Sequence, residues 1–265
     1  MTGARTVTRV ARVAPHGFPP ASGGETVFLA AMKSEASALL RQVEGASRIS
    51  DGAAAVAVRG RIGDRPVQVA VCGVGERAAR RAAERCVRLA SRGACGRVVW
   101  IGIAGALSPD LEVGDLVVGR TVTAPDRPSV DLDETLVEAA SARGCRPGVL
   151  VTAPGLVVTA SSREALWRRT GSRHRTAADM ETWPAAHVLR RAGVPFAAVR
   201  AVSDTAADRL PPWLERVSAP GGGFPLGPVV RGALMRPSAL VPLVKIRLRT
   251  ARLGVRLAEV AVALA

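Results

Sequence analysis

Continuous apolar runs alternate with amphipathic segments along most of this chain. The runs TVFLAAM (26–32), RVVWIGIAGAL (97–107) and VPFAAVRAV (194–202) are almost entirely apolar, which is typical of strands buried on both faces of a sheet. Residues 76–92, in contrast, repeat alanine and arginine at helical spacing. This alternation predicts an α/β fold, with three layers in which helices flank a central mixed, mostly parallel twisted sheet.

The other expected elements fit the same scheme. Two strands within 53–75 are expected to join at a turn at 62–65. Further strand signals lie at 113–124 and 148–160, and helix signals at 34–43, 162–169 and 177–193. In such folds catalytic groups gather at the carboxyl ends of strands. The polar residues that follow each apolar run are therefore the candidate site residues.

The net charge is strongly positive, at +15 with a sequence pI near 11.5. A nucleic-acid partner would fit that charge. Aromatic residues are only 3% of the chain, however, and tyrosine is absent, so stacking platforms for nucleic-acid bases are scarce and we expect no specific nucleic-acid partner. One arginine stripe lies at helical spacing, and a solvated face is favoured over an anion site there: Arg77, Arg81, Arg85, Arg88 and Arg92.

The chain divides into three segments by composition. Residues 1–25 are expected to form a mobile leader, because they are rich in Arg, Pro, Gly and Ser. Residues 26–218 carry the alternating pattern and are expected to form the domain. Residues 219–265 start with a Gly/Pro link and end in a basic amphipathic helix. The four cysteines form no CxxC pair, so we expect buried, reduced thiols in a cytoplasmic protein and no metal site.

Two carboxylates interrupt an apolar segment in AADMETWPAAH (177–187), at Asp179 and Glu181. An acidic residue at a helix start can be purely structural, because it interacts favourably with the helix dipole. A carboxylate in apolar surroundings is nevertheless costly unless a partner or a ligand satisfies it. From these residues alone, both interpretations are open.

Five motifs, taken in order, resemble the superfamily of purine nucleoside phosphorylases and 5′-methylthioadenosine/S-adenosylhomocysteine nucleosidases. They are AAMKSEASALL (30–40), CGVGERAARRAA (72–83), GIAGALSPDLEVGDLVV (102–118), DMET (179–182) and VRAVSDTAAD (199–208). The resemblance covers residues 26–212. It implies cleavage of a purine N-glycosidic bond through an oxocarbenium-like sugar, which needs an acid for the leaving base, groups that hold the ribose and a positioned nucleophile.

The resemblance implies catalytic roles for four residues. Asp204 would protonate N7 of the purine, with Ser203 in support. Glu35 and Arg200 would organise the nucleophile, which in the nucleosidase branch is water.

Substrate-binding roles follow from the same resemblance. Glu181 would bind the ribose hydroxyls, with Asp179 as its structural partner, and Met180 would pack against the sugar. Val157 and Val158 fall where the family lines the base pocket.

The nucleophile is either water or phosphate. Gly73 and Gly75 precede a helix and offer backbone N–H groups to a phosphate or a water molecule. Many phosphorylases carry an Arg and a Ser in the loop where this chain has Trp100 and Ile103, which disfavours ordinary phosphate binding. No metal or organic cofactor is implied, and phosphate is the candidate co-substrate.

One subfamily resembles the chain more closely than the parent family does. SDTAADRLPPW (203–213) and the tail at 235–264 look like the hopanoid-associated phosphorylases. That resemblance implies release of adenine from adenosylhopane in hopanoid biosynthesis, an adenine nucleoside with a bulky 5′ group. The alternatives are a water-using methylthioadenosine/S-adenosylhomocysteine or futalosine-type nucleosidase, and an inactive membrane- or nucleic-acid-binding protein on the same fold.

The C-terminal segment has a basic stripe on an otherwise apolar helix, formed by Lys245, Arg249, Arg252 and Arg256. Such a helix can lie on an anionic membrane, which would place the protein at the inner face of the membrane. Docking of the helix on the domain or at a subunit interface is slightly favoured over this. By resemblance we also expect a homo-oligomer.

Overall fold

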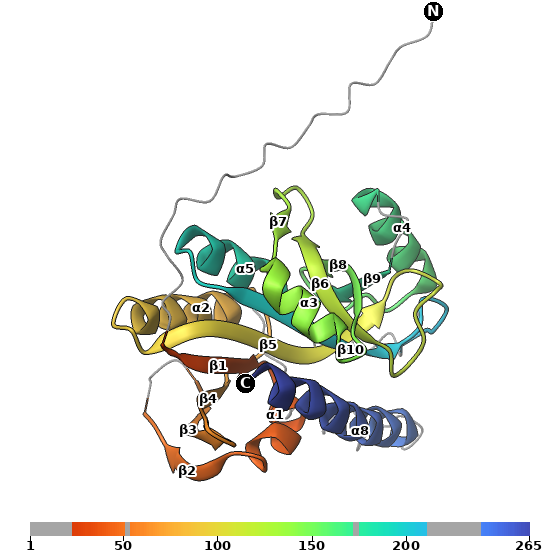
Figure 1. Ribbon diagram of the computed structural model, residues 1–265. Helices are drawn as coiled ribbons and strands as arrows, with labels where there is room; N and C mark the ends of the chain where they lie inside the picture. Colours follow the sequence, from red (N-terminus) through yellow and green to blue (C-terminus); the bar gives the residue numbers. More distant parts are fainter. Residues whose placement is uncertain (1–22, 51–53, 172–174, 211–239) are drawn as a thin grey trace, which may run out of the picture.

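The protein is a three-layer α/β structure in which helices cover both faces of a sheet of ten strands (Figure 1). It is a computed structural model that describes residues 23–50, 54–171, 175–210 and 240–265, with side chains described from residue 249 in the last range. The expected fold class, a mixed sheet between helices, is confirmed. The expected leader and the Gly/Pro link lie almost entirely outside the described residues.

The elements alternate as the apolar runs predict. In chain order they are β1 (Glu25–Ala30), α1 (Lys33–Leu40), β2 (Glu44–Arg48), β3 (Val56–Ile62), β4 (Arg65–Val71), α2 (Glu76–Ala90), β5 (Cys95–Ala106), β6 (Leu116–Thr123), β7 (Val130–Asp131), α3 (Glu134–Ser141), β8 (Arg146–Thr152), α4 (Ala160–Thr170), β9 (Thr176–Asp179), α5 (Thr182–Arg191), β10 (Phe196–Asp204) and α8 (Leu240–Leu264).

The sheet is mixed, with parallel pairs at its centre, antiparallel pairs on one side, and both parallel and antiparallel pairs on the other. Strands β4, β1, β5 and β10 run parallel, whereas β3 and β2 add to β4 as an antiparallel meander. On the other side β10 pairs with β6, which continues to β8 and β9, and β9 returns to pair with β5 at Gly105 and Ala106. Strands β5, β10, β6, β8 and β9 therefore close into a ring, which brings the ends of β5, β9 and β10 together.

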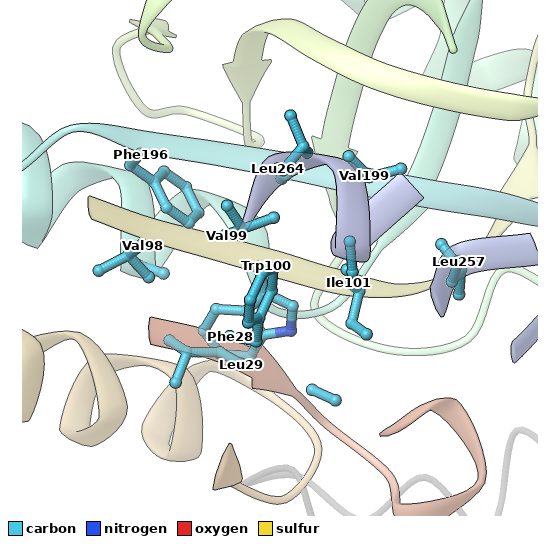
Figure 2. Close-up of a cluster of buried hydrophobic side chains, with 14 of the residues drawn as sticks. Phe28, Leu29, Val98, Val99, Trp100, Ile101, Phe196, Val199, Leu257 and Leu264 are labelled. Carbon is cyan, nitrogen blue, oxygen red and sulfur yellow. The ribbon is translucent and has the colours of Figure 1, made fainter. Parts of the chain in front are cut away.

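The core lies along β5, whose residues 98–101 are fully buried. Figure 2 shows Trp100 and Ile101 in one cluster with side chains of β1, β10 and α8, among them Phe28, Val199 and Leu257. All four cysteines are buried, and none of them forms a disulfide in the structure. The strand that leads into the candidate site is therefore held rigidly on both faces.

The helices form two layers. Helices α2 and α5 contact each other, and α1 and α8 contact each other and β5 (Figure 1). The arginine stripe of α2, interpreted from the sequence as a solvated face, is not uniformly exposed, because Arg85 is buried and donates a hydrogen bond to Gln68 Oε1 at 2.9 Å.

The described part of the C-terminal helix docks on the domain, as one of the two interpretations of the sequence expects. Leu253, Leu257 and Leu264 are buried against the core. Two arginines of the basic stripe hold the helix in place, since Arg249 donates to Ser203 O at 2.9 Å and Arg256 donates to Gly114 O. Among the described residues, no helix combines the length and the apolar character that a membrane span needs.

Removal of one side chain from this interface tests the docking. Leu257→Ala is expected to lower the free energy of unfolding by about 2–5 kcal/mol, because Leu257 is fully buried and the helix cannot close the cavity that is left. Urea unfolding measures the change. Val255→Ala on the same helix is the control, because Val255 is 46% exposed and a change below about 0.5 kcal/mol is expected. Equal effects of the two substitutions would show that the helix is not docked in solution.

Candidate active site

Glu35 is buried at the start of α1, where both of its carboxylate oxygens accept backbone hydrogen bonds. Met32 N–H donates to Oε2 at 2.8 Å, and Ile103 N–H, from β5, donates to Oε1 at 3.0 Å. Burial raises the pKa of Glu35 above its usual value, although the N–H groups of Ile103 and Met32 and the nearby charge of Arg200 act in the opposite direction. The carboxylate is thus held in place by backbone N–H groups. Because it is buried, it binds a proton more strongly than an exposed glutamate does.

Glu181 is the second buried carboxylate, and it stands at the N-cap of α5. Its Oε1 accepts the N–H of Gly75 at 2.7 Å, so it joins α5 to the loop before α2. Burial, together with the neighbouring Asp179 carboxylate, raises the pKa of Glu181 to about 7. A carboxyl group with a pKa near neutrality and a buried location is typical of a functional site.

Asp179 and Arg200 form a buried ion pair beside these two carboxylates. Arg200 Nε donates to Asp179 Oδ2 at 2.8 Å, and its Nη2 donates to Thr182 Oγ1 at 2.7 Å. Asp179 also accepts from Thr152 Oγ1 at 2.8 Å. Asp179 is therefore bound by protein groups alone, which agrees with the structural role expected for it, whereas the charge of Glu181 has no such ion-pair partner among the described residues.

Glu35 and Arg200 converge on Gly102 of β5, and Glu181 lies within electrostatic reach of both. A Cβ atom at Gly102 would lie 2.6 Å from Arg200 Nη1 and 3.1 Å from Glu35 Oε1, so only glycine leaves room for both groups. Glu35 and Arg200 both contribute to the electrostatic environment of Glu181. The structure thus brings together three residues that are far apart in the sequence, on α1, at the start of α5 and on β10.

Asp204 ends β10, and both of its oxygens are held. Ser203 Oγ lies 2.6 Å from Oδ1, and Oδ2 forms an ion pair with the guanidinium of Arg163. A Cβ atom at Gly105 would lie 2.8 Å from Asp204 Oδ2 and 3.1 Å from Arg163 Nη1. Glycine is therefore needed at this place in β5 as well, because the Asp–Arg pair packs directly against the strand.

Arg163 is the site residue that the sequence did not reveal. It lies on α4 and is only 1% exposed, and its Nη1 donates to Ala106 O at 3.2 Å and to Thr205 O at 3.0 Å. In the sequence it is one of many arginines in a short polar helix, and no motif singles it out. Only its burial and its pairing with Asp204 distinguish it.

The expected base-pocket residues lie in the loop between β8 and α4. Val158 is buried and its carbonyl accepts the N–H of Leu210 at 3.0 Å, which ties this loop to the segment that follows Asp204. Val157 is half-buried. Met180 lines a cavity of about 650 Å³ whose walls also include Gly75, Thr152 and Ala153. The contacts of Val157 and Val158 with a base stay predictions.

The glycines expected to cradle an anion use their N–H groups within the protein. Gly73 N–H donates to Ala31 O at 3.1 Å, and Gly75 N–H donates to Glu181. A phosphate at Gly75 would have to replace the Glu181 carboxylate. Trp100, at one of the positions where phosphate-binding residues are common in the family, is fully buried in the core, and Ile103 N–H donates to Glu35.

The comparison with protein families agrees with this site. A family model described as the Phosphorylase superfamily matches residues 25–216, which include every residue placed in the site above. The chain belongs to this superfamily. Its resemblance to the hopanoid-associated members stays a prediction.

Similar proteins include nucleosidases. A futalosine hydrolase of Streptomyces coelicolor is 33% identical over 131 residues, which are 42% of this chain and 55% of that protein, so the chain spans about half the length of this relative. An S-adenosylhomocysteine nucleosidase of Streptococcus pyogenes has a TM-score of 0.70 at 20% identity, with 92% of this chain and 96% of that one covered. A futalosine hydrolase of Helicobacter pylori has a TM-score of 0.69 at 17% identity, with 91% and 97% covered. At these identities the solved structures show a shared fold.

Proposed function

We propose that the protein is an enzyme that cleaves the N-glycosidic bond of an adenine nucleoside with a bulky group at C5′ and releases the free base. The observation that carries this proposal is the convergence of Glu35 and Arg200 at Gly102, with the buried carboxylate of Glu181 within electrostatic reach of both. Asp204 follows four residues after Arg200 on the same strand. An acid, a ribose-binding carboxylate and a nucleophile-binding carboxylate are the groups that this reaction needs.

The steps assign one task to each group. Asp204 donates a proton to N7 of the purine while the bond between C1′ and N9 breaks, so the base leaves neutral. Glu181 accepts hydrogen bonds from the ribose hydroxyls. A water molecule attacks C1′ and passes its proton to Glu35, whose pKa is raised by burial. Arg200 is a positioning residue, because its Nε and Nη2 donate to Asp179 and Thr182.

Water is favoured as the nucleophile. The N–H groups of Gly73 and Gly75 are occupied, and position 103 is an isoleucine whose N–H donates to Glu35, so its side chain offers no donor to a phosphate. The identity to a futalosine hydrolase supports the same choice.

Phosphorolysis of adenosylhopane in hopanoid biosynthesis is the second candidate. It is supported by the motif at 203–213 and by the apolar residue at position 103. A peripheral membrane contact would then serve a lipid-linked substrate, and Arg252 of α8 is exposed. This candidate predicts release of adenine only from the lipid-linked compound and only with phosphate.

Base release with and without phosphate tests the proposal. The full chain is incubated with 5′-methylthioadenosine, futalosine or a 5′-lipid-linked adenosine, and the free base is measured by chromatography. We expect release without phosphate from at least one substrate, and a loss of about 10²-fold or more in kcat for Glu35→Gln, because the glutamine cannot take the proton of the attacking water. Release that requires phosphate would replace hydrolysis by phosphorolysis, and no release from any nucleoside would overturn the proposal.

A further inference from the structure

Three arginines surround the cavity that opens beside Gly75 and Met180. Arg77 and Arg80 come from the first turns of α2, and Arg127 comes from the loop after β6. The other walls are formed by Ala124, Pro125, Thr152, Ala153, Pro154 and the backbone of Gly75. The cavity has a volume of about 650 Å³, which is within the range for small-molecule sites and exceeds what a nucleoside alone would fill.

One carboxylate lines this cavity together with the three arginines, and it is already held. Glu76 accepts from Arg127 Nη1 at 2.7 Å and from Arg127 Nη2 at 3.1 Å, and Arg80 Nη2 lies 3.6 Å from it. The paired Arg127 lowers the pKa of Glu76. Asp126, the neighbour of Arg127, is highly exposed and pairs with Arg169 instead. The cavity walls therefore carry a net positive charge.

Arg77 is the arginine of this group that is left free. Among the described residues, no carboxylate lies within ion-pair distance of its guanidinium, whereas Arg80 and Arg127 share Glu76. Arg127 also packs on an aromatic ring, because its guanidinium lies 4.5 Å from the centroid of the Trp183 ring. Trp183 in turn stacks on His187. Guanidinium groups bind carboxylate and phosphate groups through charge-assisted, often bidentate hydrogen bonds.

The cavity adjoins the ribose end of the candidate site. Gly75, which lines it, donates its N–H to Glu181, and Met180 lines it directly. A substituent that leaves the ribose on this side would therefore meet Arg77, Arg80 and Arg127.

From this geometry we infer that the substrate is an anionic nucleoside, whose C5′ substituent ends in a carboxylate or phosphate held by Arg77 and Arg80. This inference rests on the proposed function and narrows it to charged substrates. It disfavours adenosylhopane, whose 5′ group is a neutral lipid. A solvated arginine surface, the interpretation favoured from the sequence, would show no such preference.

A matched pair of nucleosides tests the inference. The first is 5′-(3-carboxypropylthio)-5′-deoxyadenosine and the second is its carboxamide, which has the same size and no charge. Both kcat/KM and the Kd from calorimetry are measured for each compound at low and high salt. We expect the wild-type protein to bind and cleave the carboxylate at least tenfold better than the amide, with the ratio falling at high salt. A phosphate-terminated analogue shows which anion is preferred.

Two variants assign the preference to the cavity. Arg77→Ala is expected to reduce the ratio between carboxylate and amide to about two or less. Arg81→Ala is the control, since Arg81 is exposed on the same helix and does not line the cavity, and it should leave the ratio within about twofold of wild type. A wild-type ratio near one, or an equal loss in both variants, would overturn the inference. If neither compound is cleaved, the two Kd values still decide whether the cavity selects an anion, whereas the proposed function fails only if none of the nucleosides tested above releases its base.

Discussion

Asp204→Asn is expected to lower kcat/KM for base release by about 10³-fold. The amide cannot donate a proton to N7 of the purine, and a positioned general acid contributes about 10²–10⁴-fold to such a reaction. Steady-state base release at several pH values measures the loss. An asparagine variant that retains more than about a tenth of wild-type turnover would show that another group protonates the leaving base.

The ion pair with Arg163 complicates this variant, because Arg163 is almost fully buried. Removal of one partner of a buried pair leaves an uncompensated charge and typically lowers stability by about 3–5 kcal/mol. Asp204→Asn alone would therefore lose activity through chemistry, through partial unfolding, or through both.

The double variant Asp204→Asn/Arg163→Met separates these effects. It removes both charges and fills the space of the arginine with an apolar chain, so urea unfolding should recover most of the lost stability. Activity should not recover, because no acid has been restored. If the double variant regains both stability and turnover, Asp204 has a structural role only.

The fold is predictable from the sequence where a strand is buried on both faces, because nearly all of its residues are then apolar. The strands β1, β5 and β10 are nearly unbroken apolar runs, and the turn between Ile62 and Arg65 is marked by Gly63 with a positive φ. The expected helix at 177–193 is wrong at its start, because residues 176–179 form strand β9 and α5 begins at Thr182. The elements that were missed are short or exposed. Strand β2 is exposed throughout, β7 has two residues, and α3 has eight. These elements form because they pair and pack with residues distant in the sequence, and a local sequence pattern contains no information about such contacts.

Part of the candidate site is likewise predictable from the sequence, and part depends on contacts between distant residues. Motifs identify Glu35, Glu181 and Arg200. The fold brings Glu35 and Arg200 to Gly102, with Glu181 within electrostatic reach of both, as the rule for strand ends predicts. Arg163 was not predicted, because a buried arginine and a surface arginine look alike in a sequence. The use of the Gly75 N–H by Glu181 was also missed, since this hydrogen bond joins residues 106 positions apart.

Glu181→Gln is expected to affect activity and stability in opposite directions. Ribose hydroxyls donate to the ionised carboxylate, and a hydrogen bond to a charged group contributes about 1.5–3 kcal/mol, so loss of the charge should lower kcat/KM by about 10–100-fold. In the wild-type protein kcat/KM should rise with pH through about 7, as Glu181 loses its proton. The glutamine variant should lack this rise, which pH profiles of the two proteins will show.

The stability effect follows from the direction of the same pKa shift. The folded protein holds the Glu181 proton up to a pKa of about 7, whereas the ordinary value is 4.5, so the folded state binds the proton more tightly than the unfolded state does. The free energy of unfolding contributed by this group is therefore highest below pH 4.5 and falls as the pH rises from 4.5 to 7. Glutamine resembles the protonated form. At pH 8 the variant should be more stable than wild type by about 1–3 kcal/mol, and at pH 4 the difference should vanish.

Asp179→Asn is the contrasting variant, because the two carboxylates are neighbours with different partners. Asp179 is the ion-pair partner of Arg200, so its loss should lower stability at pH 8, where loss of the Glu181 charge should raise it. Changes of opposite sign in the free energy of unfolding at pH 8 would show that Asp179 stabilises the fold. They would also show that the Glu181 carboxylate destabilises it, as expected of a group that serves substrate binding. If Glu181→Gln instead destabilised the protein at pH 8, its charge would be satisfied within the fold, and the ribose-binding role would lose its physical basis.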